Sequence, residues 1–79
     1  MTRLDTELMR FSASMRRKLA ANAHKQGWEL MSPDALTRRL MEEVSELLVA
    51  FWSNSSAVAD EAADVANFCM FMAYAARRP

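Results

Sequence analysis

Residues 40–76 decide the fold of this chain and read LMEEVSELLVAFWSNSSAVADEAADVANFCMFMAYAA. On both sides of a break at residues 53–56, apolar residues recur every three or four positions, which is the period of an amphipathic α-helix. The Ser and Asn residues of the break favour a turn followed by the cap of the next helix. The stretch therefore predicts two antiparallel helices joined by a short turn.

The same stretch gathers six carboxylates without a single Lys or Arg, namely Glu42, Glu43, Glu46, Asp60, Glu61 and Asp64. Glu43 and Glu46, like Glu61 and Asp64, are three residues apart, which is nearly one helical turn, so each pair shares a helix face. At ~100° per residue, each pair lies at the edge of its helix's apolar arc and is displaced in the same rotational sense. Antiparallel helices packed arc to arc then bring the four carboxylates together.

Converging carboxylates repel one another, by roughly 3 kcal/mol per pair at ~5 Å and an effective dielectric constant of ~20. A bound cation removes this cost, and ligation by oxygen alone suits a hard ion such as Mg²⁺ or Mn²⁺. We therefore expect a metal site at Glu43, Glu46, Glu61 and Asp64.

The apolar arcs also predict the core. On the first of the two helices the arc comprises Leu36, Leu40, Val44, Leu47, Leu48 and Phe51. On the second it comprises Val58, Ala62, Val65, Cys69 and Met72. Cys69 is the only cysteine, so an internal disulfide is excluded and a buried apolar thiol in a reducing cytoplasm is expected.

The N-terminal half contains a further amphipathic pattern from Leu4 to Ala23, which predicts a first helix. Its apolar face comprises Leu4, Leu8, Phe11, Met15 and Leu19, and its basic end comprises Arg16, Arg17 and Lys18. These three cations are expected either to be solvated or to reach a phosphate. Gly27 suits the left-handed position that closes a helix.

Ser32 followed by Pro33 is typical of an N-cap and the first helical position, so a second helix is expected from there to about Trp52. The last helix should continue to about Arg77. No repeat or interdomain linker interrupts the pattern, which predicts one all-α domain, an antiparallel bundle of about three helices spanning residues 1–79.

Length and charge narrow the choice of partners. A chain of 79 residues buries only a modest share of its surface alone, so the bundle is expected to be completed by oligomerisation. The formal net charge is zero and no long basic run is present, which argues against binding to a nucleic acid polymer. Carboxylates interrupt the apolar run of residues 57–76 and the N-terminus lacks a signal-peptide pattern, so a membrane association is not expected.

The acidic block EEVSE at residues 42–46, followed by EAAD at residues 61–64, resembles the signature of the all-α nucleoside triphosphate pyrophosphatases, the MazG-like superfamily. The segment NAHKQGW at residues 22–28 is similar to the Lys-Gly-Trp segment that precedes the first acidic helix in many members. The resemblance covers roughly residues 11–76. Members commonly have a further helical element after the second acidic helix, so we expect a second subunit to complete this bundle in a homodimer or homotetramer.

The resemblance implies Mg²⁺-dependent hydrolysis of a nucleoside or deoxynucleoside triphosphate to the monophosphate and pyrophosphate. Carried over by position, the catalytic metal ligands are Glu43, Glu46, Glu61 and Asp64, which Glu42 would support without binding the ion. Candidate substrate-binding residues are Asn22, Lys25, Trp28 and Asn67. Lys25 would contact phosphate, Trp28 would stack on the base and Asn67 would donate a hydrogen bond.

Alternatives remain open at this point. Trp28 is equally well interpreted as an aromatic side chain that covers the core, and Lys25 and Asn67 as solvent-facing polar residues. For the whole chain, the alternatives are a non-catalytic helical oligomerisation or nucleotide-binding module and an enzyme similar to phosphoribosyl-ATP pyrophosphatase. The module interpretation would pair Arg38 and Arg39 with Glu42 and Glu43 four residues on, although each such pair is worth only ~0.2 to 0.5 kcal/mol.

Overall fold

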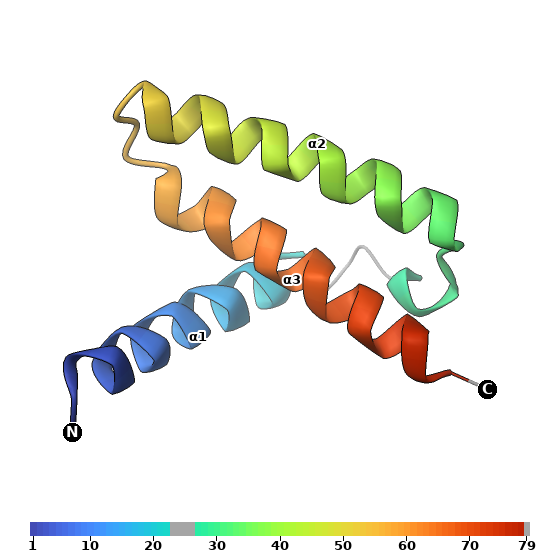
Figure 1. Ribbon diagram of the computed structural model, residues 1–79, viewed down its shortest axis with the longest axis horizontal. Helices are drawn as coiled ribbons and strands as arrows, with labels where there is room; N and C mark the ends of the chain where they lie inside the picture. The colour runs from blue at the N-terminus through green and yellow to red at the C-terminus, as the bar shows by residue number, and fades with distance from the viewer. Residues whose placement is uncertain (23–26, 79) are drawn as a thin grey trace.

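The computed structural model describes residues 1–22 and 27–78. In these residues it contains three α-helices, a single turn of 3₁₀-helix and no strand (Figure 1). The elements are α1 (Arg3–Ala21), η1 (Trp28–Leu30), α2 (Pro33–Trp52) and α3 (Val58–Arg77). The prediction of an all-α fold with three helices is confirmed, and the helix boundaries lie within two residues of those expected.

The starts of α1 and α2 are fixed by their capping residues. Thr2 and Asp5 form a reciprocal capping box at α1, in which Thr2 Oγ1 accepts from the Asp5 backbone N–H at 3.0 Å. Ser32 caps α2, because its Oγ accepts from the Ala35 N–H at 3.1 Å, and Pro33 occupies the first turn as predicted.

Two details of the connections differ from the expectations. Ala57 occupies the N-cap position of α3, where no side chain accepts a hydrogen bond from the first turn. The Ser55 hydroxyl instead accepts from the Ala57 N–H at 3.0 Å within the turn. Gly27 has the expected left-handed conformation, with φ at +104°, but it precedes η1 and does not close α1. The end of α1 is capped at Asn22, whose backbone N–H donates to the carbonyls of the last turn.

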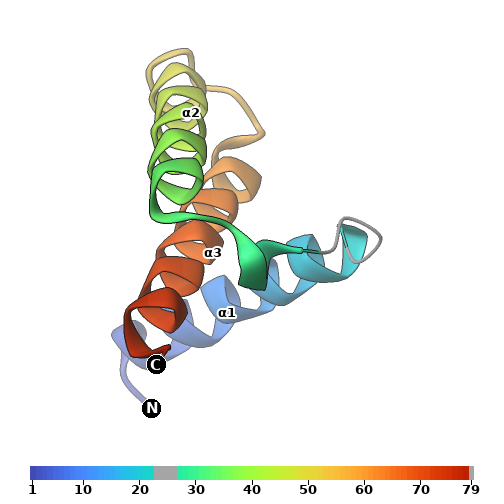
Figure 2. The same ribbon diagram turned by 90° about the vertical axis from the view of Figure 1, so that its right-hand side faces the viewer.

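α3 is the central helix of the molecule. α2 packs against it as the antiparallel partner of a helical hairpin, and α1 crosses it on another side (Figures 1 and 2). η1 lies against the C-terminal half of α3, where Trp28 stacks on Phe71. α1 and α2 diverge from each other, so the three helices form an open V with α3 at its vertex (Figure 2).

The core is small and only partly apolar. The residues buried in the described part of the chain are Ser14, Leu36, Glu43, Ala50, Ala63, Asn67 and Phe71. On α3 the buried positions are four residues apart, and on α2 they are seven apart, so each helix contributes one narrow line. Glu43 and Asn67 lie in the middle of these lines, so the core contains polar groups, and the Asn67 side chain donates to the Met15 carbonyl of α1.

The predicted core arcs were wrong at three positions. Leu48 and Phe51 are 51% and 56% exposed, and Cys69 is a free, exposed thiol. On α2 the buried line is rotated towards Glu43, so the far edge of the predicted arc faces outwards. α3 is apolar around most of its circumference, and therefore its hydrophobic pattern does not define which side faces α2 and α1.

None of the helices described combines enough length with enough hydropathy to cross a membrane.

Candidate metal centre

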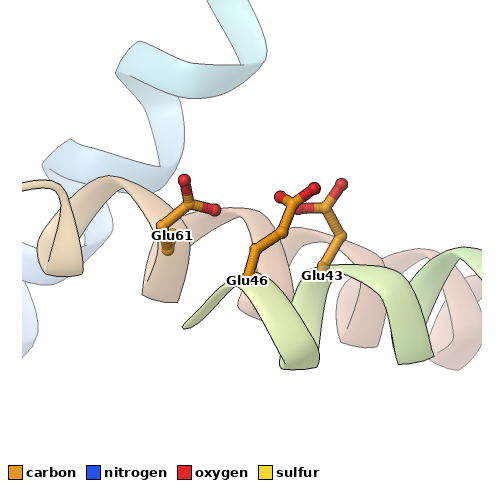
Figure 3. Close-up of side chains that lie close together, drawn as sticks. All are labelled: Glu43, Glu46 and Glu61. Carbon is orange, nitrogen blue, oxygen red and sulfur yellow. The ribbon is translucent and has the colours of Figure 1, made fainter. Parts of the chain in front are cut away.

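Three carboxylates from α2 and α3 meet in one place. One oxygen from each of Glu43, Glu46 and Glu61 lies within 4.8 Å of the others. Figure 3 shows that the two α2 carboxylates approach each other and that the Glu61 carboxylate projects to the same side of the hairpin. Glu43 and Glu46 share a face because they are nearly one turn apart, and the antiparallel α3 brings Glu61 to that face.

Asp64, the fourth expected ligand, lies beside this cluster but is held by a lysine. Its Oδ2 is 3.5 Å from Lys18 Nζ of α1. It lines the same groove as Glu43, and its negative charge contributes to the raised pKa of both Glu43 and Glu61. The structure thus brings three of the four predicted carboxylates into one group and puts Asp64 next to it in an ion pair.

Two of the carboxylates have oxygens without a partner. Glu43 is only 7% exposed, and its Oε1 accepts from Arg39 Nη2 at 2.9 Å, but within residues 1–22 and 27–78 its Oε2 has no hydrogen-bond partner. Glu61 Oε2 is also buried without a partner among the described residues. Buried carboxylate oxygens are normally satisfied, because leaving a buried charge unpaired is costly. These two oxygens therefore fit a cation bound between them.

The electrostatics of the site point the same way. Burial raises the pKa of Glu43, and the negative charges of the neighbouring Glu46 and Asp64 raise it further, against the opposing effect of Arg39. Burial likewise raises the pKa of Glu61, with additional contributions from Glu46 and Asp64 and an opposing one from Lys18. The deprotonated form of both carboxyl groups is therefore disfavoured relative to an ordinary glutamate, and a bound divalent cation would favour it.

Basic side chains surround the acidic group. Arg39 contacts both Glu42 and Glu43, and its guanidinium lies 5.2 Å from the centre of the Phe68 ring. On α1, Arg17 pairs with Asp60 at 2.9 Å in addition to the pair between Lys18 and Asp64. Two of the three cations at the basic end of α1, Arg17 and Lys18, thus pair with carboxylates of α3, whereas Arg16 is exposed. That one of these cations reaches a phosphate stays a prediction.

A groove of about 1240 Å³ opens beside the cluster. Asp64 and Phe71, two of its lining residues, are seven positions apart on α3, which separates them by about 10 Å along the helix. Near Asp64 the lining is charged and includes Lys18, Arg39 and Glu43, whereas near Phe71 it is aromatic. The groove thus combines charged and aromatic side chains, and Glu43 and Asp64 are the two expected ligands that line it.

The aromatic end is built around Trp28. Its ring stacks on Phe71 with the centroids 4.5 Å apart and 17° between the planes, and it meets the edge of Tyr74 at 5.1 Å. Trp28 is only partly exposed, so it covers the core and lines the groove at the same time. Both sequence-based interpretations of Trp28 are compatible with this position.

The other expected substrate residues have different surroundings. Asn67 is 4% exposed and its Nδ2 donates to the Met15 carbonyl of α1 at 3.2 Å. Its Oδ1 is buried and has no partner in the part of the chain that the structure describes. An acceptor role therefore fits Asn67 better than the expected donor role. Asn22 lines the groove and its Nδ2 donates to the Lys18 carbonyl at 3.0 Å. Lys25 lies outside the described residues.

Some groups of the site were not assigned from the sequence. Phe68 and Phe71 line the groove on α3, and Lys18 reaches Asp64 across the contact between α1 and α3. Nothing in the sequence fixes how α1 crosses α3, so this ion pair has no sequence signal. Arg39 does have one, since it lies four residues before Glu43 on the same helix.

Comparison of the chain with models of protein families, with curated proteins and with solved structures gave no match in any of the three. The resemblance to the MazG-like superfamily therefore depends on the spacing of the motifs in this sequence. The fold and the site define a class only in general terms, as an all-helical protein whose carboxylates converge from two antiparallel helices beside an amphipathic groove.

Proposed function

We propose that the protein is a Mg²⁺-dependent nucleoside triphosphate pyrophosphohydrolase. It would convert a nucleoside or deoxynucleoside triphosphate and water to the monophosphate and pyrophosphate. One observation carries the proposal: Glu43 and Glu61 each hold a buried carboxylate oxygen without a partner, in a cluster that Glu46 completes. The motif spacing at residues 42–46 and 61–64 gives that cluster its resemblance to the pyrophosphatase signature.

The donor set fits a hard divalent ion. Glu43, Glu46 and Glu61, with Asp64 beside them, offer carboxylate oxygens only, which suits Mg²⁺ and also Mn²⁺. When bound, the ion neutralises phosphate oxygens and lowers the pKa of a bound water. The unpartnered oxygens of Glu43 and Glu61 are the atoms that would hold it.

The chain's own residues would position the substrate around this centre. Lys18 and Arg39 line the groove and supply positive charge for phosphate oxygens, for which they would exchange part of their pairing with Asp64, Glu42 and Glu43. A carboxylate of the cluster that is not bound to the ion would accept the proton of the attacking water. Hydrolysis then breaks the bond between the α-phosphorus and its bridging oxygen, and the two products are the nucleotide monophosphate and pyrophosphate.

The aromatic end of the groove would take the base. Trp28 extends the stacked surface that begins at Phe71, and a base placed there has its phosphates directed along α3 towards Asp64. The distance of about 10 Å between the two ends suits a base and its triphosphate. The unpartnered Asn67 Oδ1 offers an acceptor between them.

A panel of canonical and modified NTPs and dNTPs, incubated with the protein and Mg²⁺, tests the proposal. We expect monophosphate and pyrophosphate from at least one compound, and loss of both products when EDTA removes the ion. Release of inorganic phosphate with a diphosphate product would contradict the assigned reaction. Including phosphoribosyl-ATP in the panel distinguishes the related enzyme class.

A second candidate is a nucleotide-binding or oligomerisation module without turnover. It is favoured by the ion pairs that Lys18 and Arg39 make with Asp64 and Glu43, because these already neutralise part of the acidic charge. Binding of a nucleotide without any product, across the whole panel, would support the module. Under either function we propose a homodimer or homotetramer. We also propose a cytoplasmic location, because a reducing compartment suits a chain with one free thiol.

A further inference from the structure

An apolar stripe lies on the outer face of α2. It consists of Met41, Ser45, Leu48 and Trp52, which repeat at intervals of four, three and four residues and are all exposed. The three apolar members are 64%, 51% and 79% exposed. This spacing places all four within about 60° of one another on the helix, as in the seam of a coiled coil. We refer to these four residues as the outer stripe.

The outer stripe faces away from the chain's own core. Glu43 and Ala50 lie on the buried line of α2, and at ~100° per residue the middle of the outer stripe is about 170° from Glu43. α3 therefore covers one side of α2, and none of the described helices covers the opposite side. A row of exposed apolar side chains of this kind is typical of an interaction surface.

The total surface indicates how much area is left to cover. A folded monomer of 9.0 kDa exposes about 4,850 Å², whereas this chain exposes 6042 Å². The excess of about 1,200 Å² is larger than the ~800 Å² that each partner contributes to a standard protein–protein interface. The chain thus exposes more surface than is usual for an isolated monomer of its mass, and the outer stripe is part of that surface.

The charges near the stripe decide between possible partners. Residues 40–52 of α2 include three glutamates and no Lys or Arg, so an anionic membrane surface would repel this part of the helix. The stripe is, however, complementary to itself. In an antiparallel pair of α2 helices centred between Glu46 and Leu47, Met41 meets Trp52 of the second copy, and the small Ser45 meets Leu48.

We propose that the outer stripe of α2 is the contact surface of a homodimer, in which the α2 helices of two copies pack antiparallel across a twofold axis. A twofold contact of this type uses the same patch on both subunits and closes after two copies. Each α2 then lies between its own α3 and the α2 of the second copy. The proposal does not depend on the proposed enzymatic activity, since it uses only the face of α2 opposite the carboxylates.

Sedimentation equilibrium of the full chain tests the proposal with a matched pair of variants. Leu48→Lys introduces a charge into the outer stripe, and Leu8→Lys introduces the same charge at a comparably exposed position on α1. We expect the unmodified chain and Leu8→Lys to have twice the 9.0 kDa mass of one chain, and Leu48→Lys to lose half of that mass. Neither leucine is buried within the chain, so circular dichroism should show helices in both variants.

Three results would overturn the proposal: a monomeric wild-type chain, dissociation of Leu8→Lys without dissociation of Leu48→Lys, or equal dissociation of both. The fluorescence of Trp52 gives a second measurement that does not depend on a charged variant. In a Trp28→Phe background, the only remaining indole is Trp52, and the dimer predicts emission at the short wavelengths of a covered side chain. Emission of a fully solvated indole at every protein concentration would also overturn the proposal.

Discussion

On the inner face of α2, Glu43 is buried against α3 with one oxygen unpartnered, whereas on the outer face Leu48 and Trp52 are exposed to solvent. Both faces depart from the usual distribution of residues, and they do so in opposite directions. The inner face buries a carboxylate oxygen that has no hydrogen-bond partner among the described residues, and the outer face leaves apolar side chains in water. Neither arrangement stabilises the chain on its own.

The comparison indicates that each face of α2 lacks a binding partner, and that the two partners differ in chemistry. A buried carboxylate is relieved by a cation, and an exposed apolar stripe is relieved by another apolar surface. Complete burial of one Leu or Met side chain is worth about 1.5–3 kcal/mol, so a contact through the outer stripe adds several kcal/mol in total. A ligand on one side and a second copy on the other would compensate the weaknesses of a small core.

Glu46→Gln should produce the largest effect on activity. It should also distinguish the two faces of α2, because we expect it to change activity without changing the oligomeric state. Glu46 completes the carboxylate cluster, but it is exposed and two positions from Leu48 of the outer stripe. We expect pyrophosphate release to fall by about 100-fold or more, a loss of at least ~2.7 kcal/mol of transition-state stabilisation, while the sedimenting mass stays unchanged. Release of pyrophosphate is measured at saturating Mg²⁺, and circular dichroism checks the helices.

Glu42→Gln is the matched control for that variant. Glu42 is on the same helix and is also exposed, but it pairs with Arg39 and lies outside the group of three converging carboxylates. An exposed ion pair is worth at most ~1 kcal/mol, so the activity of Glu42→Gln should stay within about fivefold of the wild type. Equal losses in the two variants would remove the assignment of Glu46 to the metal centre.

Magnesium should stabilise the inner face by an amount that thermal unfolding can measure. At a free Mg²⁺ concentration about ten times Kd, binding to the folded state alone adds about 1.4 kcal/mol. For a domain of this size, that corresponds to an increase in Tm of roughly 6–11 °C. Glu46→Gln should show a much smaller increase than Leu8→Lys, and an unchanged wild-type Tm at millimolar Mg²⁺ would favour the module without a metal.

The sequence predicted the helices much better than it predicted their faces. Ser32 and Pro33 define the start of α2 because capping is a local interaction, and the three-residue spacing of Glu43 and Glu46 defines a shared face for the same reason. The rotation of each helix about its axis depends on its neighbours. Since α3 is apolar on most sides, Cys69 was assigned to the core, although the contacts with α1 and α2 leave it exposed.

The same limit applies to the site. Convergence of Glu61 with Glu43 followed from the antiparallel arrangement, which the short turn between α2 and α3 enforces. The pairing of Lys18 with Asp64 did not follow, because no local rule determines how α1 crosses α3. Long-range placement is therefore the part of the site that sequence spacing alone leaves undetermined.

Glu61→Gln should stabilise the metal-free protein, although it removes a ligand. The glutamine keeps the shape of the side chain, but it removes a charge that burial and the neighbouring Glu46 and Asp64 disfavour. We expect the free energy of unfolding without Mg²⁺ to rise by about 1 kcal/mol, and the increase in Tm on adding Mg²⁺ to disappear. A variant that is less stable than the wild type in EDTA would show that Glu61 is satisfied without a cation.

The pH dependence of stability should show the smallest effect. Its sign distinguishes the contribution of the carboxylates on the inner face from that of other carboxylates in the chain. The folded-state pKa values of Glu43 and Glu61 are raised above those of an unfolded glutamate, chiefly by burial, so the folded protein binds more protons between the two values. Their contribution to stability is complete below the ordinary pKa of glutamate and is lost as the pH rises through the raised values. The pKa of Asp5 is lowered by its hydrogen bonds to Thr2 and so contributes with the opposite sign, but this contribution is the same in the wild type and in Glu61→Gln.

The difference in Tm between the wild type and Glu61→Gln in EDTA should therefore widen as the pH rises through this window. Saturating Mg²⁺ should reverse the sign of that difference, because the ion binds the deprotonated carboxylates. Parallel pH profiles for the two proteins, with and without Mg²⁺, would mean that the carboxylates of the inner face are solvated like those on the surface.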